Sequence, residues 1–241
     1  MLITFLLGLF ILLGAVLARR ASNQALIEQV SISVACGTMT ALALLELLPE
    51  ALEHMDGRLP LMAVLVAAGV GVLKWLDRFV PEHDHAHGFH HDCTEENVTH
   101  LGVISAVAVM LHNLVEGMTV YSIAAESWRM GALMALGVGL HNLPMGMMIG
   151  STLRNEPRRK QAAFLAAAAL STFAGGVVMK LLWFAITDFV VGVLLCLALG
   201  MMIYIVLLEL LPHLMHAPRK GLSAACAAVG VAIILLSRLL E

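Results

Sequence analysis

Eight long apolar stretches, separated by short polar segments, constrain this sequence more than any other feature. A helix that spans a lipid bilayer needs about 20 predominantly apolar residues. The stretches that meet this need cover residues 2–18, 28–54, 59–79, 101–124, 130–153, 161–179, 189–214 and 221–240. Because 60% of the 241 residues are hydrophobic and only 13% are charged, a soluble domain of this length could not cover its apolar surface. The sequence therefore predicts an all-α, polytopic membrane protein with eight transmembrane helices in a single domain, residues 1–241.

The 14 lysine and arginine residues predict how these helices are oriented, since basic residues collect on the cytosolic side. The segments after the first, third, fifth and seventh stretches, with their flanks, hold Arg19, Arg20, Lys74, Arg78, Arg154, Arg158, Arg159, Lys160, Arg219 and Lys220. The opposite side holds only Arg58, Arg129, Lys180 and Arg238. This imbalance predicts a plasma-membrane protein with both termini outside the cell and the polar segment 81–100 in the cytosol.

Two pairs of segments repeat within the chain. Residues 37–49 and 200–212 share Leu-Leu-Glu-Leu-Leu-Pro without a gap, and they lie on stretches that cross the membrane in opposite directions. A second antiparallel pair consists of residues 112–118 and 141–147, which both begin with His-Asn-Leu. Such pairs are typical of the inverted repeats of secondary transporters. Glu46 is then expected near the outer mouth of a pathway and Glu209 near the inner one.

The second pair of repeats predicts a metal site near the middle of the membrane. His112 and Glu116 are one helical turn apart and share a face, as do His141 and Met145. Imidazole and carboxylate groups suit zinc and its divalent neighbours, and a thioether favours softer ions. A single buried histidine is better explained by a hydrogen bond to a neighbouring helix, whereas two in matching segments with a glutamate favour a metal site. Met145 is explained equally well by core packing.

Asn113 and Asn142 follow the two histidines directly and add side-chain carbonyl oxygens to this predicted site. Three further groups of residues could attract metal along a pathway. They are Glu50 and Glu53 after Pro49, His213 and His216 after Pro212, and His83, His85, His87, His90 and His91 of the cytosolic loop. The first two groups are equally consistent with solvated helix ends. The loop is interpreted as a flexible metal trap, with a disordered polar linker as the alternative.

These segments together resemble the ZIP (Zrt/Irt-like protein) family of metal transporters over essentially the whole chain. The most specific match is His112-Asn113-x-x-Glu116-Gly117. The resemblance implies uptake of zinc-type divalent cations into the cytosol through a binuclear site. It implies the ligands His112, Asn113, Glu116, His141 and Asn142, a thioether ligand at Met39, and pathway carboxylates at Glu46 and Glu209.

The sequence departs from the family pattern at two places. The family usually has a glutamate where this chain has Met145, and often has another within the stretch 171–176, which here reads Ser-Thr-Phe-Ala-Gly-Gly. We therefore expect one transport site, built from Met39, His112, Glu116 and His141, with Met145 as an additional ligand. A single carboxylate leaves the bound complex with net positive charge, which weakens binding in a medium of low dielectric constant.

The sequence thus predicts a transporter of a divalent transition metal, zinc above all, and not an enzyme. The metal ion would be the substrate, without an organic cofactor, and the partners would be that ion and the lipid bilayer. No basic segment suggests nucleic-acid binding, and the small residues of the sixth stretch permit packing within a protomer or in a homodimer. Two alternatives remain: a membrane metal sensor or buffer that transports nothing, and an intramembrane metal-dependent hydrolase. The absence of an HExxH motif argues against the hydrolase.

Overall fold

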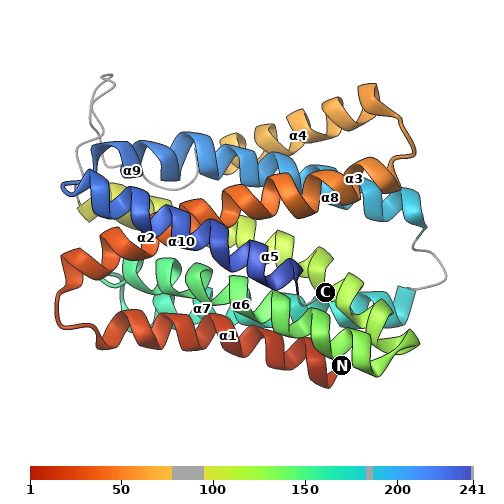
Figure 1. Ribbon diagram of the computed structural model, residues 1–241, viewed down its shortest axis with the longest axis horizontal. Helices are drawn as coiled ribbons and strands as arrows, with labels where there is room; N and C mark the ends of the chain where they lie inside the picture. Colours follow the sequence, from red (N-terminus) through yellow and green to blue (C-terminus); the bar gives the residue numbers. More distant parts are fainter. Residues whose placement is uncertain (78–94, 183–186, 240–241) are drawn as a thin grey trace.

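The structure, a computed structural model, describes residues 1–77, 95–182 and 187–239. These residues form ten α-helices and two short π-helical turns, η1 and η2 (Figure 1). In chain order they are α1 Leu2–Arg20, α2 Gln24–Leu42, η1 Ala43–Leu47, α3 Leu48–His54, α4 Leu59–Asp77, α5 Glu95–Glu126, α6 Trp128–Thr152, α7 Arg158–Leu182, α8 Asp188–Tyr204, η2 Ile205–Leu210, α9 Leu211–His216 and α10 Lys220–Arg238.

The helices confirm the prediction of an all-α, polytopic membrane protein. Seven helical segments are long and apolar enough to cross a membrane, with α2–η1–α3 and α8–η2–α9 each counted as one segment. The eighth predicted span is α4, whose apolar part, Leu59–Trp75, is shorter within the described residues. Helix α1 begins and α10 ends at the same end of the bundle (Figure 1), as an even number of crossings requires.

Apolar side chains on the outside of the bundle match a lipid environment. On α1, Leu7, Ile11 and Ala15 recur at helical spacing and are buried against neighbouring helices. Leu9 and Leu13 point away from the bundle and are almost half exposed. An exposed apolar face of this kind would cause association or aggregation in water, whereas in a bilayer it contacts apolar lipid chains.

Capping side chains fix where several helices begin. The side-chain oxygen of Asn23 accepts a hydrogen bond from the backbone N–H of Leu26, so α2 starts at Gln24 and not at the predicted residue 28. Ser127 caps α6 in the same way, so this helix begins at Trp128, two residues before the predicted start of that span. Thr187 caps α8, which confirms the break predicted at Thr187 and Asp188.

The polar segment 81–100 is shorter than the sequence predicted. Its last six residues, 95–100, belong to α5, which begins at Glu95. The sequence Glu95-Glu96 suits a helix start, because acidic residues are favoured at the positive end of the helix dipole. Residues 81–94, with all five histidines of the predicted metal trap, lie outside the described residues, so their role stays a prediction.

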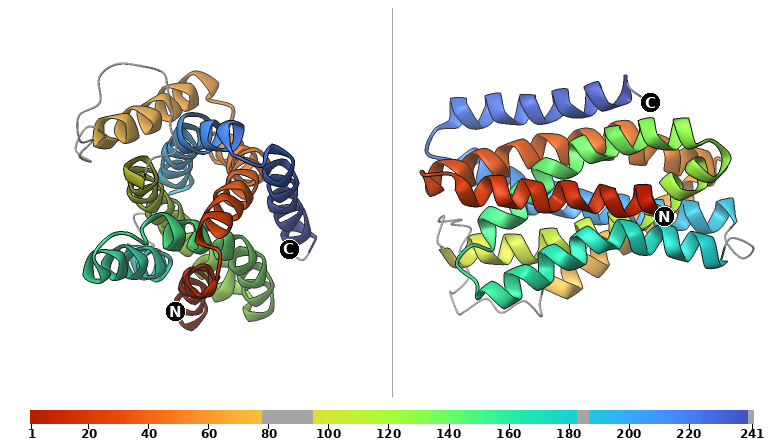
Figure 2. Two further views of the ribbon diagram at one scale, coloured as in Figure 1. Left: turned by 90° about the vertical axis from the view of Figure 1, so that its left-hand side faces the viewer. Right: turned by 90° about the horizontal axis from the view of Figure 1, so that it is seen from below.

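The helices form two groups, and each group contains two closely packed helix pairs. Helices α1, α5, α6 and α7 make one group, and α2, α4, α8 and α10 make the other (Figures 1 and 2). In the first group α1 packs on α6 and α5 packs on α7. In the second group α2 packs on α10 and α4 packs on α8. Each pair joins helices from the two halves of the chain, and the two pairs within a group correspond to each other.

Glycines at equivalent positions let the paired helices touch backbone to backbone. A Cβ atom on Gly146 of α6 would lie 2.1 Å from the Ile11 carbonyl oxygen of α1. A Cβ atom on Gly117 of α5 would lie 1.9 Å from the Thr172 carbonyl oxygen of α7. Gly146 follows His141 by the same number of residues as Gly117 follows His112, so the contacts correspond in the two repeats.

The repeated Leu-Leu-Glu-Leu-Leu-Pro segments share a local deformation as well. Pro49 and Pro212 lack an N–H, and a proline ring within a helix clashes with the carbonyl four residues earlier. Both helices widen into a π turn just before the proline: the Leu48 N–H bonds to the Ala43 carbonyl, and the Leu211 N–H bonds to the Val206 carbonyl. Equal packing and equal deformation in opposite halves support the predicted inverted repeat.

Candidate metal centre

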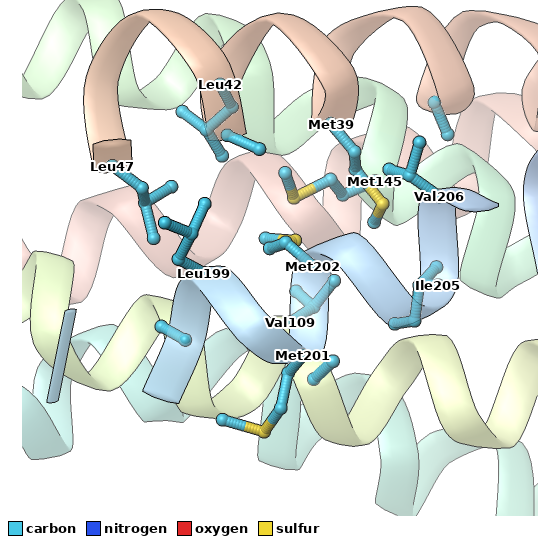
Figure 3. Close-up of a cluster of buried hydrophobic side chains, with 14 of the residues drawn as sticks. Met39, Leu42, Leu47, Val109, Met145, Leu199, Met201, Met202, Ile205 and Val206 are labelled. Carbon is cyan, nitrogen blue, oxygen red and sulfur yellow. The ribbon is translucent and has the colours of Figure 1, made fainter. Parts of the chain in front are cut away.

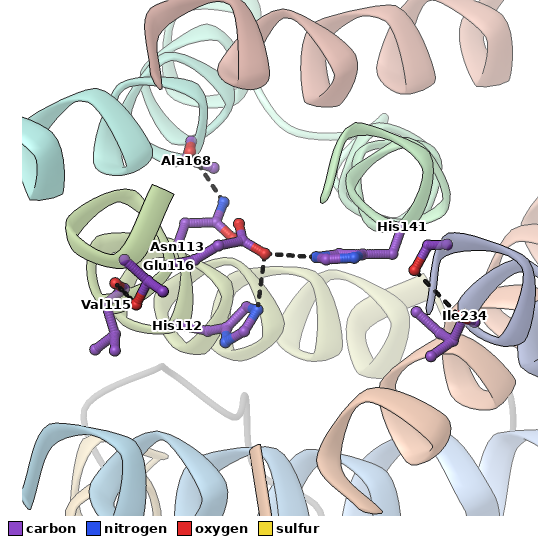
Figure 4. A network of polar contacts seen from close by, with 9 residues as sticks. His112, Asn113, Val115, Glu116, His141, Ala168 and Ile234 are labelled. Atoms are coloured by element: carbon purple, nitrogen blue, oxygen red, sulfur yellow. Dashed lines mark hydrogen bonds and ion pairs between the residues drawn. The ribbon is translucent and has the colours of Figure 1, made fainter. Parts of the chain in front are cut away.

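Helices α5 and α6 bring two imidazoles and one carboxylate together inside the bundle (Figure 4). The Nε2 atom of His141 lies 2.7 Å from Oε1 of Glu116, and the Nε2 atom of His112 lies 3.6 Å from the same oxygen. One ligand atom from each residue lies within 4.8 Å of the other two. All three residues are buried, with exposed fractions of 6% or less.

Several polar atoms around this trio are buried without a hydrogen-bond partner. They are Nε2 of His112, Oε2 of Glu116, Oδ1 of Asn113, Oγ1 of Thr172 and both amide atoms of Asn142. The Asn113 amide nitrogen donates to the Ala168 carbonyl at 3.4 Å. An unsatisfied buried polar atom costs about 1–3 kcal/mol. So many of them in one place indicate a site that gains its partners from a bound ion or from water.

The spacing of the trio suits a zinc-type cation. Ligand atoms around a tetrahedral zinc lie roughly 3.3 Å apart, given bonds of about 2.0–2.1 Å to nitrogen. The two observed nitrogen-to-oxygen distances, 2.7 and 3.6 Å, lie on either side of that value. Metal binding requires a neutral imidazole and an ionised carboxylate, so the proton between His141 and Glu116 would leave as the ion enters.

Met39, Met145 and Met202 are among the buried methionines of the core cluster (Figure 3). Met39 comes from α2, Met145 from α6 and Met202 from α8, and none is exposed. Met145 follows His141 by one helical turn, so its thioether lies on the same face of α6. Met202 occupies the position in the second long repeat that Met39 occupies in the first.

A small cavity of about 20 Å³ lies between two residues of the trio and two of the predicted outer carboxylates. Glu46 of η1 and Glu50 of α3 line it together with His112 and Glu116 of α5. Glu53 does not line this cavity, and it is exposed at the end of α3. The structure therefore brings two of the three outer carboxylates to the cavity that reaches the metal centre.

A second cavity lies where α2 begins and the α9–α10 connection passes. His213 lines it opposite Glu28 and Asn23. The Nδ1 atom of His213 lies 2.8 Å from the Glu209 carbonyl oxygen, and Nδ1 of His216 lies 2.9 Å from that of Pro212. An Nδ1–H donor in these bonds makes Nε2 the acceptor nitrogen of each ring.

Glu209 is half-buried on η2, and His216 is exposed on α9. Sequence reasoning missed Glu28. A carboxylate near the start of a helix is common, and no motif sets this one apart.

The second departure from the family pattern has a structural reason. A Cβ atom on Gly175 of α7 would lie 1.9 Å from the Leu114 carbonyl oxygen and 2.8 Å from its carbonyl carbon. Both atoms belong to the backbone of α5 and cannot move aside as a flexible side chain would. A glutamate at this position would push α7 away from the helix that carries His112 and Glu116.

Comparison with known proteins agrees with this geometry. Residues 80–238 match the family model described as ZIP zinc transporter. The chain is 31% identical to a zinc transporter ZupT from Chlorobium luteolum, with 100% of this chain and 97% of that protein aligned. It is 27% identical to a zinc transporter ZupT from Clostridium perfringens, with 97% and 94% aligned, and 29% identical to one from an Enterobacter species, with 98% and 96% aligned. With its helices, its buried His–Glu–His centre and these relatives, the chain belongs to the ZIP family of zinc transporters.

Proposed function

We propose that this protein carries zinc, or a closely related divalent cation, across the plasma membrane towards the cytosol through the centre formed by His112, Glu116 and His141. The observation that carries the proposal is this buried trio, which lies on two antiparallel helices and is reached by a cavity lined with carboxylates. Family membership supports metal transport, and the relatives named above are zinc transporters.

In this proposal the ion passes from carboxylates to imidazoles. Glu50 and Glu46 attract the hydrated cation, since carboxylates at the mouth of a cavity of low dielectric constant raise the local cation concentration. At the centre the ion exchanges water for His112, Glu116 and His141, while Met39, Met145, Asn113 and Asn142 supply further ligands. It then leaves past Glu209, His213 and His216 towards His83, His85, His87, His90 and His91.

We also propose how the protein is oriented and assembled in the membrane. Both termini lie outside the cell, because ten of the 14 basic residues fall on the other side of the predicted topology. The lipid bilayer is the solvent of the exposed apolar faces, and a homodimer within it is compatible with the small residues of α7. The alternatives, a sensor or buffer without transport and a hydrolase, are not favoured, because proteins of the ZIP family are transporters and not enzymes.

The test is metal flux into liposomes that contain the purified protein and a metal-sensitive dye. We expect saturable influx of zinc or of a few divalent ions, and its loss in His112→Ala and in His141→Ala. Stoichiometric metal binding that needs the same histidines, without flux of any ion, would refute transport and leave a sensor.

A carboxylate at position 145 is expected to tighten zinc binding. With Glu116 as the carboxylate of the trio, a divalent ion leaves a net positive charge in a buried site. Met145→Glu would add the second negative charge that the family usually has. We expect the apparent KM for zinc to fall about tenfold, which corresponds to about 1.4 kcal/mol. Met145→Gln adds a polar group without the charge and serves as the control, because an equal effect of both variants would contradict the electrostatic reason.

A further inference from the structure

Pro49, which follows the π turn, removes the usual helical donor of the Leu45 backbone carbonyl. In an α-helix the carbonyl of Leu45 would accept a hydrogen bond from the N–H of residue 49, which is a proline and has none to give. A carbonyl that loses its helical partner needs another donor, because an unpaired backbone group away from water is costly. Leu45 directly precedes Glu46, which lines the cavity at the metal centre.

The missing donor comes from the far end of the chain. An Nη1–H of Arg238 donates a hydrogen bond to the Leu45 carbonyl oxygen. Arg238 is the last residue of α10, and it is exposed at the end of the bundle. A hydrogen bond from a charged donor is about twice as strong as one between neutral groups.

The packing of α10 delivers Arg238 to this carbonyl. A Cβ atom on Gly37 of α2 would lie 1.9 Å from the Ala227 carbonyl oxygen of α10, and one on Gly230 would lie 2.2 Å from the Val34 carbonyl oxygen of α2. Backbone contacts this close fix how the two helices are placed along each other. Ser237, next to Arg238, is buried and donates to the Ile234 carbonyl at 3.1 Å. The end of α10 is therefore held over the π turn, and the hydrogen bond from Arg238 to the Leu45 carbonyl is called the brace below.

In the amino-acid sequence, the position of Arg238 in the other repeat carries a residue of opposite charge. Helix α4 packs on α8 as α10 packs on α2, and Gly69 of α4 takes the place of Gly230. The residue at the position of Arg238 is then Asp77, and an ionised aspartate has no proton to donate. The arginine thus distinguishes the π turn that carries Glu46 from the one that carries Glu209.

From these contacts we infer that Arg238 is a positioning residue for metal entry: it binds the carbonyl freed by Pro49 and so holds the π turn that aims Glu46 into the cavity. The part of this inference that concerns transport rests on the proposed function. Glu46 lies in the cavity before the His–Glu–His trio, so its misplacement weakens capture of the ion more than passage through the trio. Loss of Arg238 therefore raises the KM for zinc and leaves the maximal rate nearly unchanged.

The transport experiment is a double-mutant cycle between Arg238 and Pro49 in liposomes. We expect Arg238→Met to raise the apparent KM for zinc about fivefold, and Arg238→Lys, which keeps a charged donor, to stay near the wild type. In a Pro49→Ala background residue 49 supplies the N–H itself, so Arg238→Met should have no further effect. An equal KM shift in both backgrounds, or no shift in either, would overturn the inference, because a direct effect of the charge on Glu46 does not depend on Pro49. Arg129→Gln is the control for loss of a basic residue near the same end of the bundle.

Hydrogen exchange tests the brace without transport and without the proline variant. In purified Arg238→Met we expect faster exchange of the amides of residues 43–48, whereas the amides of 205–211 in η2 exchange as in the wild type. Unchanged exchange at 43–48 would overturn the inference even if the KM changes. Faster exchange at 43–48 in Arg238→Met, together with no flux of any ion by the wild-type protein, would support the contact of Arg238 with Leu45 and refute the proposed function instead.

Discussion

Glu116→Gln is expected to reduce zinc flux at least about 100-fold while the protein still folds. Glutamine has the shape of glutamate and keeps an oxygen that can accept the hydrogen bond from His141 Nε2. It removes the negative charge that faces both histidines, so a divalent ion would enter a buried site with neutral ligands alone. An uncompensated charge in such a place costs several kcal/mol, which corresponds to a factor of 100 or more.

Two measurements separate this loss of binding from a loss of folding. Zinc should raise the melting temperature of the wild-type protein in detergent, because a ligand that binds the native state stabilises it. In Glu116→Gln this rise should vanish, while the melting temperature without metal stays at or above that of the wild type. Glu156→Gln, which removes a carboxylate paired with Lys160 at 2.9 Å on the surface, is the matched control. Wild-type flux in Glu116→Gln would remove Glu116 from the proposed centre.

Gly175→Ala is expected to destabilise the protein strongly without touching any proposed ligand. The added methyl group would lie 1.9 Å from the Leu114 carbonyl oxygen, so α5 and α7 would have to separate. Overpacking against a rigid neighbour costs about 3 kcal/mol, which lowers the melting temperature of a protein of this size by roughly 6–12 °C. Gly117→Ala should act alike, because its methyl group would meet the Thr172 carbonyl oxygen of α7 at the same distance.

Gly71 of α4 provides the control for this prediction. A Cβ atom there would meet no other atom within 4 Å, and alanine is favoured over glycine inside a helix. We therefore expect Gly71→Ala to leave the melting temperature unchanged or to raise it slightly. Equal melting temperatures for Gly175→Ala and Gly71→Ala would contradict the close contact between α5 and α7.

The helices and their order could be predicted from the sequence because each transmembrane helix appears there as a long apolar stretch. A long apolar stretch in a bilayer must be helical to satisfy its backbone, whatever surrounds it. The helix starts were predicted less well, since Asn23 and Ser127 extend α2 and α6 through caps that hydropathy does not register. The π turns were not predicted. They depend on how each helix accommodates Pro49 and Pro212, which composition alone does not reveal.

The trio of the candidate site followed from spacing within two short repeats, and the structure places these three residues together. Residues joined across distant helices could not be found in this way. Arg238 and Leu45 meet because Gly37 and Gly230 let α10 lie directly on α2, and nothing near either residue in the sequence signals the contact. Gly175 is a similar case: the sequence showed that a carboxylate is missing, and only the packing shows why one cannot be accommodated.

The correspondence between the two halves also bears on how the two mouths of the proposed pathway differ. If the halves were identical in sequence, the two faces of the molecule would be equivalent, and an ion would meet the same groups from either side. Any asymmetry must therefore come from positions where the repeats differ. In the register that pairs Glu46 with Glu209, the carboxylates Glu50 and Glu53 stand opposite the imidazoles His213 and His216. Carboxylates attract a cation that still holds its water, whereas imidazoles bind one that has lost it and release it when they take up protons. The two mouths of the proposed pathway thus differ chemically at a few positions where the two repeats differ in sequence.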